Sequence, residues 1–452
     1  MNGAIVQSVM KNSGRTSCST PNGPPPFASK KFALRQIPGP DVAAGPLPIE
    51  GTLQTVYVGP KRKATQYTTA AAQAIRQRRR AMRCATVRPY PMRMTPRLPK
   101  PRADLAAFPP YRTGQQKADV RLNANEWAEP NPAGDWLTPQ ELDAVLLNRY
   151  PTAAVDLRGL LAERYRVEPD QLVLGNGSNE VLLNTFLVFG GHGRKTLLFQ
   201  PTYSMHGRLT VIAGGTVVDE VIGLPYDITR DRAVATAARA RADIVVFTTP
   251  NNPTGNEIPF DAILAVAEAH PETLVLVDEA YSDFAGTTLL PELATHPNMV
   301  ISKTFSKVRA AAGLRVGILV THPAVAELFR AVQLPYNVSS LTHAVAAKIA
   351  KDDASVPRRV EQNRRERGRV FAALKKIRAI EVFPSVTNFV LFRMKDEPPA
   401  AVHTRFLEQS VLIRDISMWP GCAGCLRVSI GTPAENDRFI AALDHVFAAA
   451  PA

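Results

Sequence analysis

Apolar runs and amphipathic stretches alternate along the chain from about residue 150. Five short runs are apolar nearly throughout: 197–201, 243–250, 273–280, 298–306 and 315–321. Uninterrupted apolar runs are typical of strands that helices cover on both faces. Segments between them, such as 155–167 and 260–270, carry apolar residues at helical spacing. The repeated strand and helix order predicts an α/β fold with a mostly parallel sheet.

The pattern changes after residue 335. One long helical segment over about 341–377 is followed by strand-like stretches at 381–394, 411–417 and 425–432, and by a closing helix from about Glu435. This order predicts a smaller α+β domain. We therefore expect an N-terminal arm at 101–150, a large domain at 151–335 and a small C-terminal domain at 336–452.

The first 100 residues show neither the helical nor the strand spacing of apolar residues, and they hold 13 of the 38 prolines. They carry 17 basic and 2 acidic residues, whereas the rest of the chain carries 37 basic and 38 acidic residues. A proline-rich, acid-poor stretch with few large apolar side chains cannot offset its ordering entropy, so we predict a disordered basic extension over 1–100. The net charge of +14 therefore says nothing about nucleic-acid binding by the near-neutral body.

Three hypotheses account for this extension. We favour a translation start at Met82, Met92 or Met94. An Arg-rich transit segment for an organelle is the second hypothesis, although 13 prolines fit poorly with an amphipathic helix. A solvated extension with a binding role is the third, and its best segment is the arginine cluster at 76–88.

Composition argues against several classes of protein. No run of about 18 apolar residues is present, so we expect no membrane span, and the N-terminus lacks a secretory pattern. Four cysteines argue against a disulfide framework and favour a reducing, cytoplasmic location. Cys422 and Cys425 form a lone CxxC without a second pair, so we expect no metal site.

Unusual polar residues follow three consecutive predicted strands. They are Asn251 and Asn252, then Asp278 and Tyr281, then Lys303, Lys307 and Arg315. In an open α/β sheet such residues meet in one crevice at the carboxyl ends of the strands. Singly, Asn252 could form a turn, Asp278 a helix cap and Lys307 a surface charge, but a carboxylate directly after an apolar run needs a cationic partner.

These motifs resemble the fold-type I aminotransferases that depend on pyridoxal 5'-phosphate. The resemblance rests on NNPTG, VDEAY and TFSK with an arginine eight residues after the lysine. More narrowly, the chain is similar to the histidinol-phosphate aminotransferases in LNANEW, NRYP, GNGSNE, PTYSMH, PYNVSS, VLIRD and CLRVSIGT. The similarity spans roughly residues 102–450.

The resemblance implies roles for the polar residues of the crevice. Lys307 would form the Schiff base with the cofactor and then act as general base. Asp278 would pair with the protonated pyridine nitrogen, which keeps the ring an electron sink. Asn252 and Tyr281 would bind the phenolic oxygen of the ring, and Tyr203 would stack on its face.

The cofactor phosphate needs donors and positive charge. GNGSNE precedes a helical pattern, so the backbone N–H groups of Ser178 and Asn179 would point at the phosphate, although a plain helix cap fits this turn almost as well. By the same resemblance, Thr304, Ser306 and Arg315 would complete the phosphate site.

Substrate and subunit contacts are also implied by the resemblance. Arg427 and Arg414 resemble the two arginines that hold the anionic end of the substrate, which suits a phosphate monoester. Trp127 would cover the substrate side chain, unless it only packs the arm onto the body. Tyr150 resembles the residue that reaches the cofactor phosphate of a neighbouring subunit, which implies a homodimer.

The chain departs from the family beside the lysine. Arg309 and Ala310 stand where the family has an aromatic residue and a glycine, and Ile318 replaces an aromatic residue. Lys303 is a competing Schiff-base lysine, but its spacing to Arg315 does not fit the family.

The leading hypothesis from this resemblance is amino-group transfer between L-histidinol phosphate and 2-oxoglutarate in histidine biosynthesis. The alternatives are an aromatic amino-acid aminotransferase and a threonine-phosphate decarboxylase. A catalytically silent regulator with a nucleic-acid-binding tail is a more distant alternative. It is disfavoured because Lys307, Asp278 and Asn252 are all present and the tail has few aromatic residues for base stacking.

Overall fold

A computed structural model describes residues 99–106, 108–111, 116–151 and 156–448. The extension predicted to be disordered falls almost entirely at 1–98, outside the described residues. The chain divides after Pro96, and every helix and strand given below belongs to the unit Arg97–Ala452. The predicted domain boundaries at 150 and 335 stay a prediction.

A seven-stranded sheet forms the centre of the larger part. Its strands, in spatial order, are β2 (Leu172–Asn176), β8 (Val316–Thr321), β7 (Met299–Thr304), β6 (Leu274–Asp278), β5 (Ile244–Thr248), β3 (Lys195–Gln200) and β4 (Thr216–Val221). Only β8 runs antiparallel to its neighbours, β2 and β7. The prediction of a mostly parallel sheet is confirmed.

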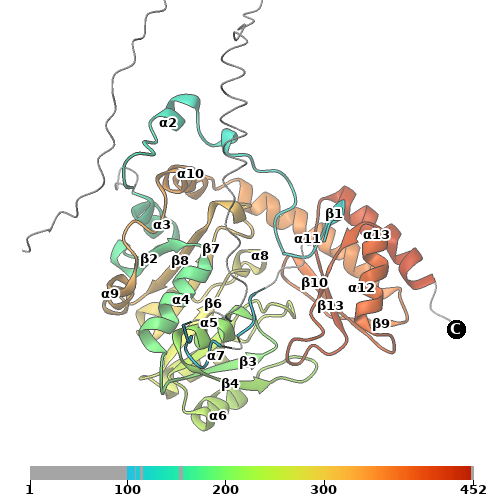
Figure 1. Cartoon of the computed structure of the whole chain (residues 1–452), viewed down its shortest axis with the longest axis horizontal. Coiled ribbons are helices and arrows are strands. Elements are labelled where there is room, and N and C mark those ends of the chain that lie inside the picture. The colour runs from blue at the N-terminus through green and yellow to red at the C-terminus, as the bar shows by residue number, and fades with distance from the viewer. Residues whose placement is uncertain (1–98, 107, 112–115, 152–155, 449–452) are drawn as a thin grey trace, which may run out of the picture. The chain divides into compact units, whose positions relative to one another are not determined.

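Helices cover both faces of this sheet (Figure 1). Apolar side chains of α4 (Ser178–Phe189), α5 (Met205–Ala213) and α9 (Pro323–Val332) pack on one face. Those of α3 (Leu157–Tyr165), α6 (Arg230–Ala240), α7 (Phe260–Ala269) and α10 (Ser340–Lys351) pack on the other. Successive residues of a strand serve opposite faces, as with Val245 and Val246 of β5, which explains the uninterrupted apolar runs.

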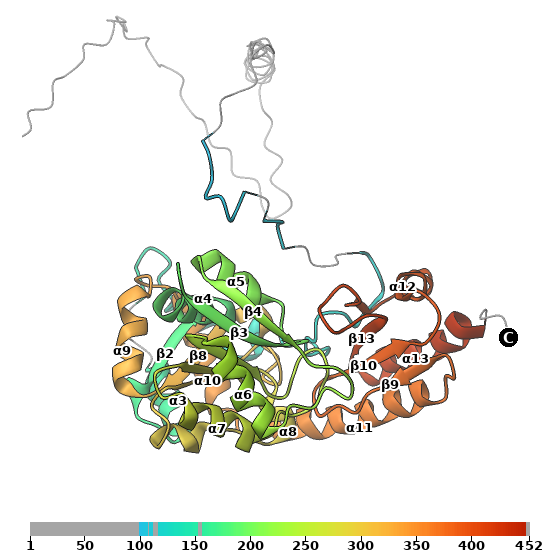
Figure 2. The same ribbon diagram turned by 90° about the horizontal axis from the view of Figure 1, so that it is seen from below.

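A second, antiparallel sheet forms the smaller part. Its strands in spatial order are β12 (Arg414–Asp415), β13 (Cys425–Ser429), β10 (Phe389–Met394) and β9 (Ile380–Val382). The helices α11 (Ser355–Lys375), α12 (Pro399–Glu408) and α13 (Pro433–Ala448) lie at this sheet in Figure 2. The arm joins it because β1 (Val120–Arg121) pairs with β11 (Val411–Leu412). Among the described helices, none combines the length and apolar character of a membrane span.

The prediction of one helix over 341–377 is wrong. The structure has two helices there, α10 and α11, separated at residues 352–354. Asp352 ends the first in an extended conformation and accepts a hydrogen bond at 3.1 Å from the backbone N–H of Ser355. Pro357 then stands in the first turn of α11, where its missing N–H removes no helical hydrogen bond. Two local signals therefore override the continuous alanine-rich pattern.

Two short helices also matter below. The helix α2 (Pro139–Asp143) lies in the arm, and α8 (Ser282–Ala285) follows β6. A 3-10 turn at Leu290–Ala294 leads toward β7, and another at Ala312–Leu314 precedes β8.

Candidate active site

The polar residues predicted to meet do line one cavity. Its volume is about 170 Å³, and it lies where β5, β6 and β7 end. Its walls include ten of the predicted site residues: Ser178, Asn179, Tyr203, Asn252, Asp278, Tyr281, Thr304, Ser306, Lys307 and Arg315. Arg427 is bonded to Asn252 just behind them. The parallel order of β5, β6 and β7 brings their carboxyl ends to one edge.

Asp278 is a buried carboxylate at the end of β6. Its Oδ2 lies 3.1 Å from Nε2 of His206, and its Oδ1 accepts a hydrogen bond at 3.1 Å from the N–H of Ala280. His206 is fully buried and stands edge-on to the ring of Tyr203, with 5.5 Å between the ring centroids. Neither partner provides a permanent positive charge, so this carboxylate is suited to face a cationic group in the cavity.

Tyr203 forms one wall of the cavity. Its hydroxyl donates to Oδ1 of Asn179 at 3.2 Å, which fixes the ring in place. Burial raises the pKa of Tyr203, so the phenol stays protonated. The ring is thus a neutral face that can stack on an aromatic ligand.

Lys307 follows β7 and is half-buried in the cavity wall. Its Nζ donates to the backbone carbonyl of Ala124 at 3.3 Å and lies 5.5 Å from the ring centroid of Tyr281. Lys307 forms no ion pair with any residue in the described part of the chain. Its amine is therefore held by one carbonyl only and can reach a ligand.

Tyr281 is buried beside this lysine. Its hydroxyl accepts a hydrogen bond at 3.0 Å from the side-chain amide of Asn125, which leaves the hydroxyl proton free to donate into the cavity. Asn125 has a positive φ of 54° and is tied to Ser429 through two hydrogen bonds of 2.9 Å. The arm is thereby anchored to β13 and closes one side of the site.

Arg427 is buried on β13 and directed at Asn252. Its Nη1 donates to Oδ1 of Asn252, its Nη2 donates to the carbonyl of Asn123 at 3.1 Å, and its Nε has no hydrogen-bond partner among the described residues. Burial, and then the neighbouring charge of Arg414, lower the pKa of Arg427 to about 10, with nearby tyrosines acting the other way. Arg414 faces Arg427 across the β12–β13 pair. Two guanidinium groups at this edge favour an anionic ligand.

The first residues of α4, Ser178 and Asn179, also line the cavity. α4 begins at Ser178, directly after Gly177, whose φ is 85°. A Cβ atom on Gly177 would lie 2.0 Å from Nη2 of Arg315, and one on Gly317 would lie 2.4 Å from N of Ser178. Both glycines are needed for this close approach, which sets Arg315 beside the helix N-terminus.

Two hydroxyl groups complete this end. Thr304 donates from Oγ1 to Oγ of Ser306 at 3.0 Å, and Thr304 Oγ1 accepts from the N–H of Ser306 at 3.1 Å. The helix N-terminus, the hydroxyls and Arg315 together form an arrangement suited to a phosphate group.

Four predicted site residues do not line this cavity: Arg427, described above, and the three that follow. Trp127 packs against the cluster of Tyr281, Phe284, Val308 and Phe389, and its ring lies 5.8 Å from the guanidinium carbon of Arg359. Arg414 is half-buried behind Arg427. Tyr150 is 73% exposed and stacks on Tyr336 at 4.4 Å between ring centroids, in a different cavity.

The competing lysine, Lys303, points elsewhere. Its Nζ forms an ion pair with Glu279 at 2.5 Å and donates to Oγ of Ser282 at 2.8 Å. Burial by itself lowers the pKa of Lys303, but Glu279, together with Asp283 and Tyr165, raises it on balance. A lysine held in the charged form outside the cavity cannot act as the nucleophile.

Two residues near the reacting groups had no role in the sequence-based prediction. His206 belongs to the motif PTYSMH and Asn125 to LNANEW, but nothing in the sequence assigned either residue a role of its own. A histidine five residues after the proline that follows β3 has no periodic or charge pattern that reveals contact with Asp278. Among the described residues no group of three or more His, Cys, Asp or Glu side chains gathers as a metal site, and Cys422 and Cys425 are buried free thiols.

Comparison with known proteins places the chain in a family. The sequence profile of aminotransferase class I and II matches residues 113–443. A histidinol-phosphate aminotransferase of Streptomyces avermitilis is 40% identical over 357 residues, which cover 76% of this chain and 95% of that protein. One from Ruminiclostridium cellulolyticum is 33% identical over 343 residues, covering 74% and 94%.

A solved structure shares the fold. It is the histidinol-phosphate aminotransferase of Sinorhizobium meliloti in complex with pyridoxal 5'-phosphate, with a TM-score of 0.67 and 24% identity over 74% of this chain and 92% of that chain. The fold is therefore that of the fold-type I aminotransferases, as expected. The chain belongs to the class I and II aminotransferases, in the histidinol-phosphate aminotransferase family that these relatives represent.

Proposed function

We propose that this enzyme transfers an amino group between L-histidinol phosphate and 2-oxoglutarate with pyridoxal 5'-phosphate as cofactor. The observation that carries the choice of substrate is the buried guanidinium of Arg427, with Arg414 beside it, at the edge of the cavity that holds Lys307. Two arginines suit a doubly charged phosphate monoester better than a single carboxylate. The names of the relatives agree with this choice.

The residues of the cavity fit the proposed cofactor. Among the described residues, His206 is the one side chain that bonds the buried carboxylate of Asp278, so a protonated pyridine nitrogen would complete its pairing. The N–H groups at the start of α4, with Thr304, Ser306 and Arg315, would hold the phosphate. When bound, this cofactor supplies an electron sink for the carbanion that forms at the substrate carbon.

Lys307 would hold the cofactor and move the proton. Within the described part of the chain only the carbonyl of Ala124 binds its Nζ, so the amine is free to accept a proton from the substrate carbon and to return it at the neighbouring position. Such general base catalysis contributes about 10²–10⁴-fold.

Asn252 and Tyr281 would orient the aromatic ring of the cofactor. Asn252 uses its Oδ1 for Arg427, which leaves its NH₂ group to donate, and Tyr281 keeps its hydroxyl proton to donate. Asn252 thus touches both the substrate-binding arginine and the cofactor site, and it would couple substrate entry to the ring.

We further propose a homodimer in which Tyr150 serves the neighbouring site. Tyr150 and the Tyr336 ring stacked on it are 73% and 59% exposed, and Tyr150 lines a largely apolar cavity with Leu146 and Ala347. Exposed aromatic side chains in such a patch favour a protein partner. Trp127 would support the arm from outside the cavity. The cytoplasmic location and the absence of a nucleic-acid ligand stay predictions.

Substrate comparison tests the assignment. The purified holoenzyme, with 2-oxoglutarate as acceptor, should have a much higher kcat/KM for histidinol phosphate than for phenylalanine. Arg427→Met should raise KM for histidinol phosphate by at least about tenfold, because a charged hydrogen-bond partner is lost. A clear preference for phenylalanine would overturn the assignment, and release of CO₂ from threonine phosphate would point to a decarboxylase.

A further inference from the structure

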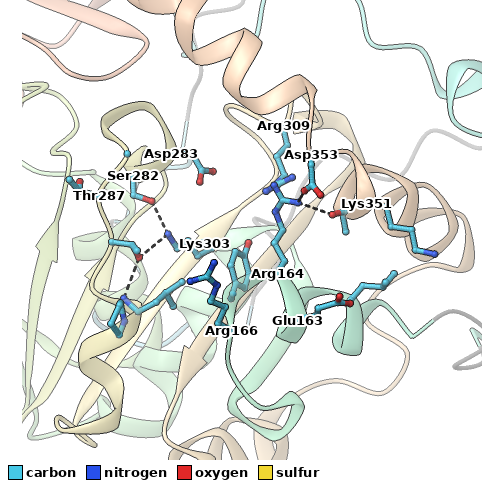
Figure 3. Close-up of a pocket in the computed structure, with 17 residues that line it drawn as sticks. Glu163, Arg164, Arg166, Ser282, Asp283, Thr287, Lys303, Arg309, Lys351 and Asp353 are labelled. Atoms are coloured by element: carbon cyan, nitrogen blue, oxygen red, sulfur yellow. Dashed lines mark hydrogen bonds and ion pairs between the residues drawn. The ribbon is translucent and has the colours of Figure 1, made fainter.

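A second and larger cavity lies apart from the candidate active site (Figure 3). Its volume is about 1010 Å³, and none of its wall residues lines the first cavity. Its walls come from the C-terminal ends of α3 and α10, from α8 and the turn after it, and from the loop that follows Lys307. Cavities of about 300–1,000 Å³ are typical of small-molecule sites.

We propose that this cavity binds a small organic anion through Arg309, by a phosphate or carboxylate group. Arg309 stands on the loop two residues after Lys307 and is only 3% exposed. Its Nη1 has no hydrogen-bond partner, and the side chain forms no ion pair with any described residue. A buried charge normally has ion-pair or hydrogen-bond partners that offset its lost hydration, and this guanidinium lacks them in part.

This guanidinium lies near an aromatic ring. Its carbon lies 5.2 Å from the ring centroid of Phe305. A ring face offsets part of the desolvation of a cation but accepts no N–H hydrogen bond in the guanidinium plane. The planar N–H donors are therefore the feature that an oxyanion would satisfy, and two parallel hydrogen bonds to a carboxylate or phosphate match their geometry.

Three of the other seven charged side chains in the wall of this cavity are paired. Lys303 is paired with Glu279, and Arg164 with Asp353. Of the cations in the wall, Arg309, Arg166 and Lys351 have no ion pair with described residues; of the acids, Asp283 and Glu163 have none. Arg166 and Lys351 are exposed at the rim, whereas Arg309 is buried.

This charge distribution determines which end of the ligand would face Arg309. Figure 3 shows Asp283 and Arg309 around the same space, with Arg164 and Lys303 nearby. An incoming anion would pass the two cations at the rim and reach Arg309 with its anionic group, while Asp283 would weaken binding by like-charge repulsion. The volume exceeds that of a single inorganic ion, so the rest of an organic ligand would fill the outer part.

Calorimetric titration of the holoenzyme tests this site. The probes are inorganic phosphate, pyrophosphate and citrate, which separate phosphate from carboxylate chemistry. We expect two separable sites in the wild type. Arg309→Met should weaken one by at least tenfold, and Arg427→Met should weaken only the other, which belongs to the substrate. Arg158→Met changes an exposed arginine on α3 that does not line the cavity, and it should leave both sites intact.

Two further variants make the result decisive. Arg309→Lys should retain part of the affinity, since it keeps the charge but not the planar donors, and Asp283→Asn should strengthen binding several-fold. An unchanged anion affinity in Arg309→Met, in protein that keeps its fold and its bound cofactor, would overturn the proposal. So would weaker binding in Asp283→Asn, which would indicate that Asp283 organises the guanidinium instead of an anion. Neither result bears on the Arg427 site, so the proposed function would stand.

Discussion

Two lysines four residues apart have opposite surroundings, and the difference decides which one is reactive. Lys303 faces away from the cavity and is neutralised by Glu279, whereas Lys307 lines the cavity with only a backbone carbonyl on its amine. On an isolated strand both are simply lysines near a strand end. Their roles follow from the direction in which β7 and the loop after it point them.

Removing each lysine should have a different effect. Lys307→Ala should lower turnover by at least about 10²-fold and abolish the visible absorption of the holoenzyme, with little change in the unfolding midpoint. Lys303→Met should keep the absorption but lose about 3–5 kcal/mol of stability, because Glu279 would remain buried and unpaired. Absorption spectra and thermal unfolding of both variants measure this. Retained turnover in Lys307→Ala would contradict the assigned role.

At the scale of elements, the phosphate end of the site depends on β8 passing close to the start of α4. A Cβ atom on Gly317 would lie 2.3 Å from the carbonyl carbon of Gly177, and this obstacle is backbone. The two elements cannot keep their register if this glycine gains a side chain.

Gly317→Ala should therefore destabilise the fold by about 1–3 kcal/mol and weaken cofactor retention. Gly313→Ala is the matched control, because no atom lies within 4 Å of its added Cβ. Chemical unfolding and the rate of cofactor loss on dialysis compare the two. Equal stability of the two variants would show that β8 and α4 can separate at no cost.

The contact between α2 and α10 should respond to acid. A hydrogen bond from Lys348, and then one from the backbone of Thr138, lower the pKa of Glu141 from 4.5 to about 2. Because the pKa is lower in the folded chain, the pair stabilises the fold above about pH 4.5, and this contribution disappears as the pH falls toward 2.

Glu141→Gln keeps the helix-capping geometry and removes the charge. The wild type should unfold at a higher temperature than this variant at pH 7, and the gap should narrow steadily below pH 4.5. Thermal scans across that range measure it. A gap that stays constant with pH would contradict the ionic origin of the contact.

Element prediction from the sequence succeeded where tertiary environment and local pattern agree. The runs that became β3, β5, β6, β7 and β8 are apolar because both faces of the sheet are covered. Strands β2 and β4 were not predicted. β4 lies at the sheet edge with half-buried residues, so its pattern is weak. The division of 341–377 into α10 and α11 depends on Asp352 and Pro357. The spacing of apolar residues alone takes no account of these two residues.

At the scale of the whole molecule, the proposed homodimer makes a prediction about shared sites. If Tyr150 serves the neighbouring site, Lys307→Ala and Tyr150→Ala subunits should each be weakly active alone. After dissociation and reassociation together, each mixed dimer would hold one intact site. Activity should then rise well above the sum of the two parents. Assays of mixed and separately treated samples measure this, and an activity equal to the average of the parents would contradict the shared site.

By itself the sequence determined the α/β class, the strand-end residues Asn252, Asp278 and Lys307, and the resemblance that connects them to an aminotransferase. Those features are local: a strand, the polar residue that ends it, and a short motif. Only the tertiary structure decided which side chains touch. It brought His206 to Asp278, Asn125 to Tyr281 and Arg427 to Asn252, across 72, 156 and 175 residues.

The same physical reason applies to Arg309. The sequence marked it only as a departure from the family, because an arginine on a loop is normally exposed and solvated. Burial without a partner is a property of the folded chain, since it depends on where Phe305, α3 and α8 lie around the side chain. Residue types and their order along the chain are written in the sequence, whereas burial and long-range pairing exist only once the chain has folded.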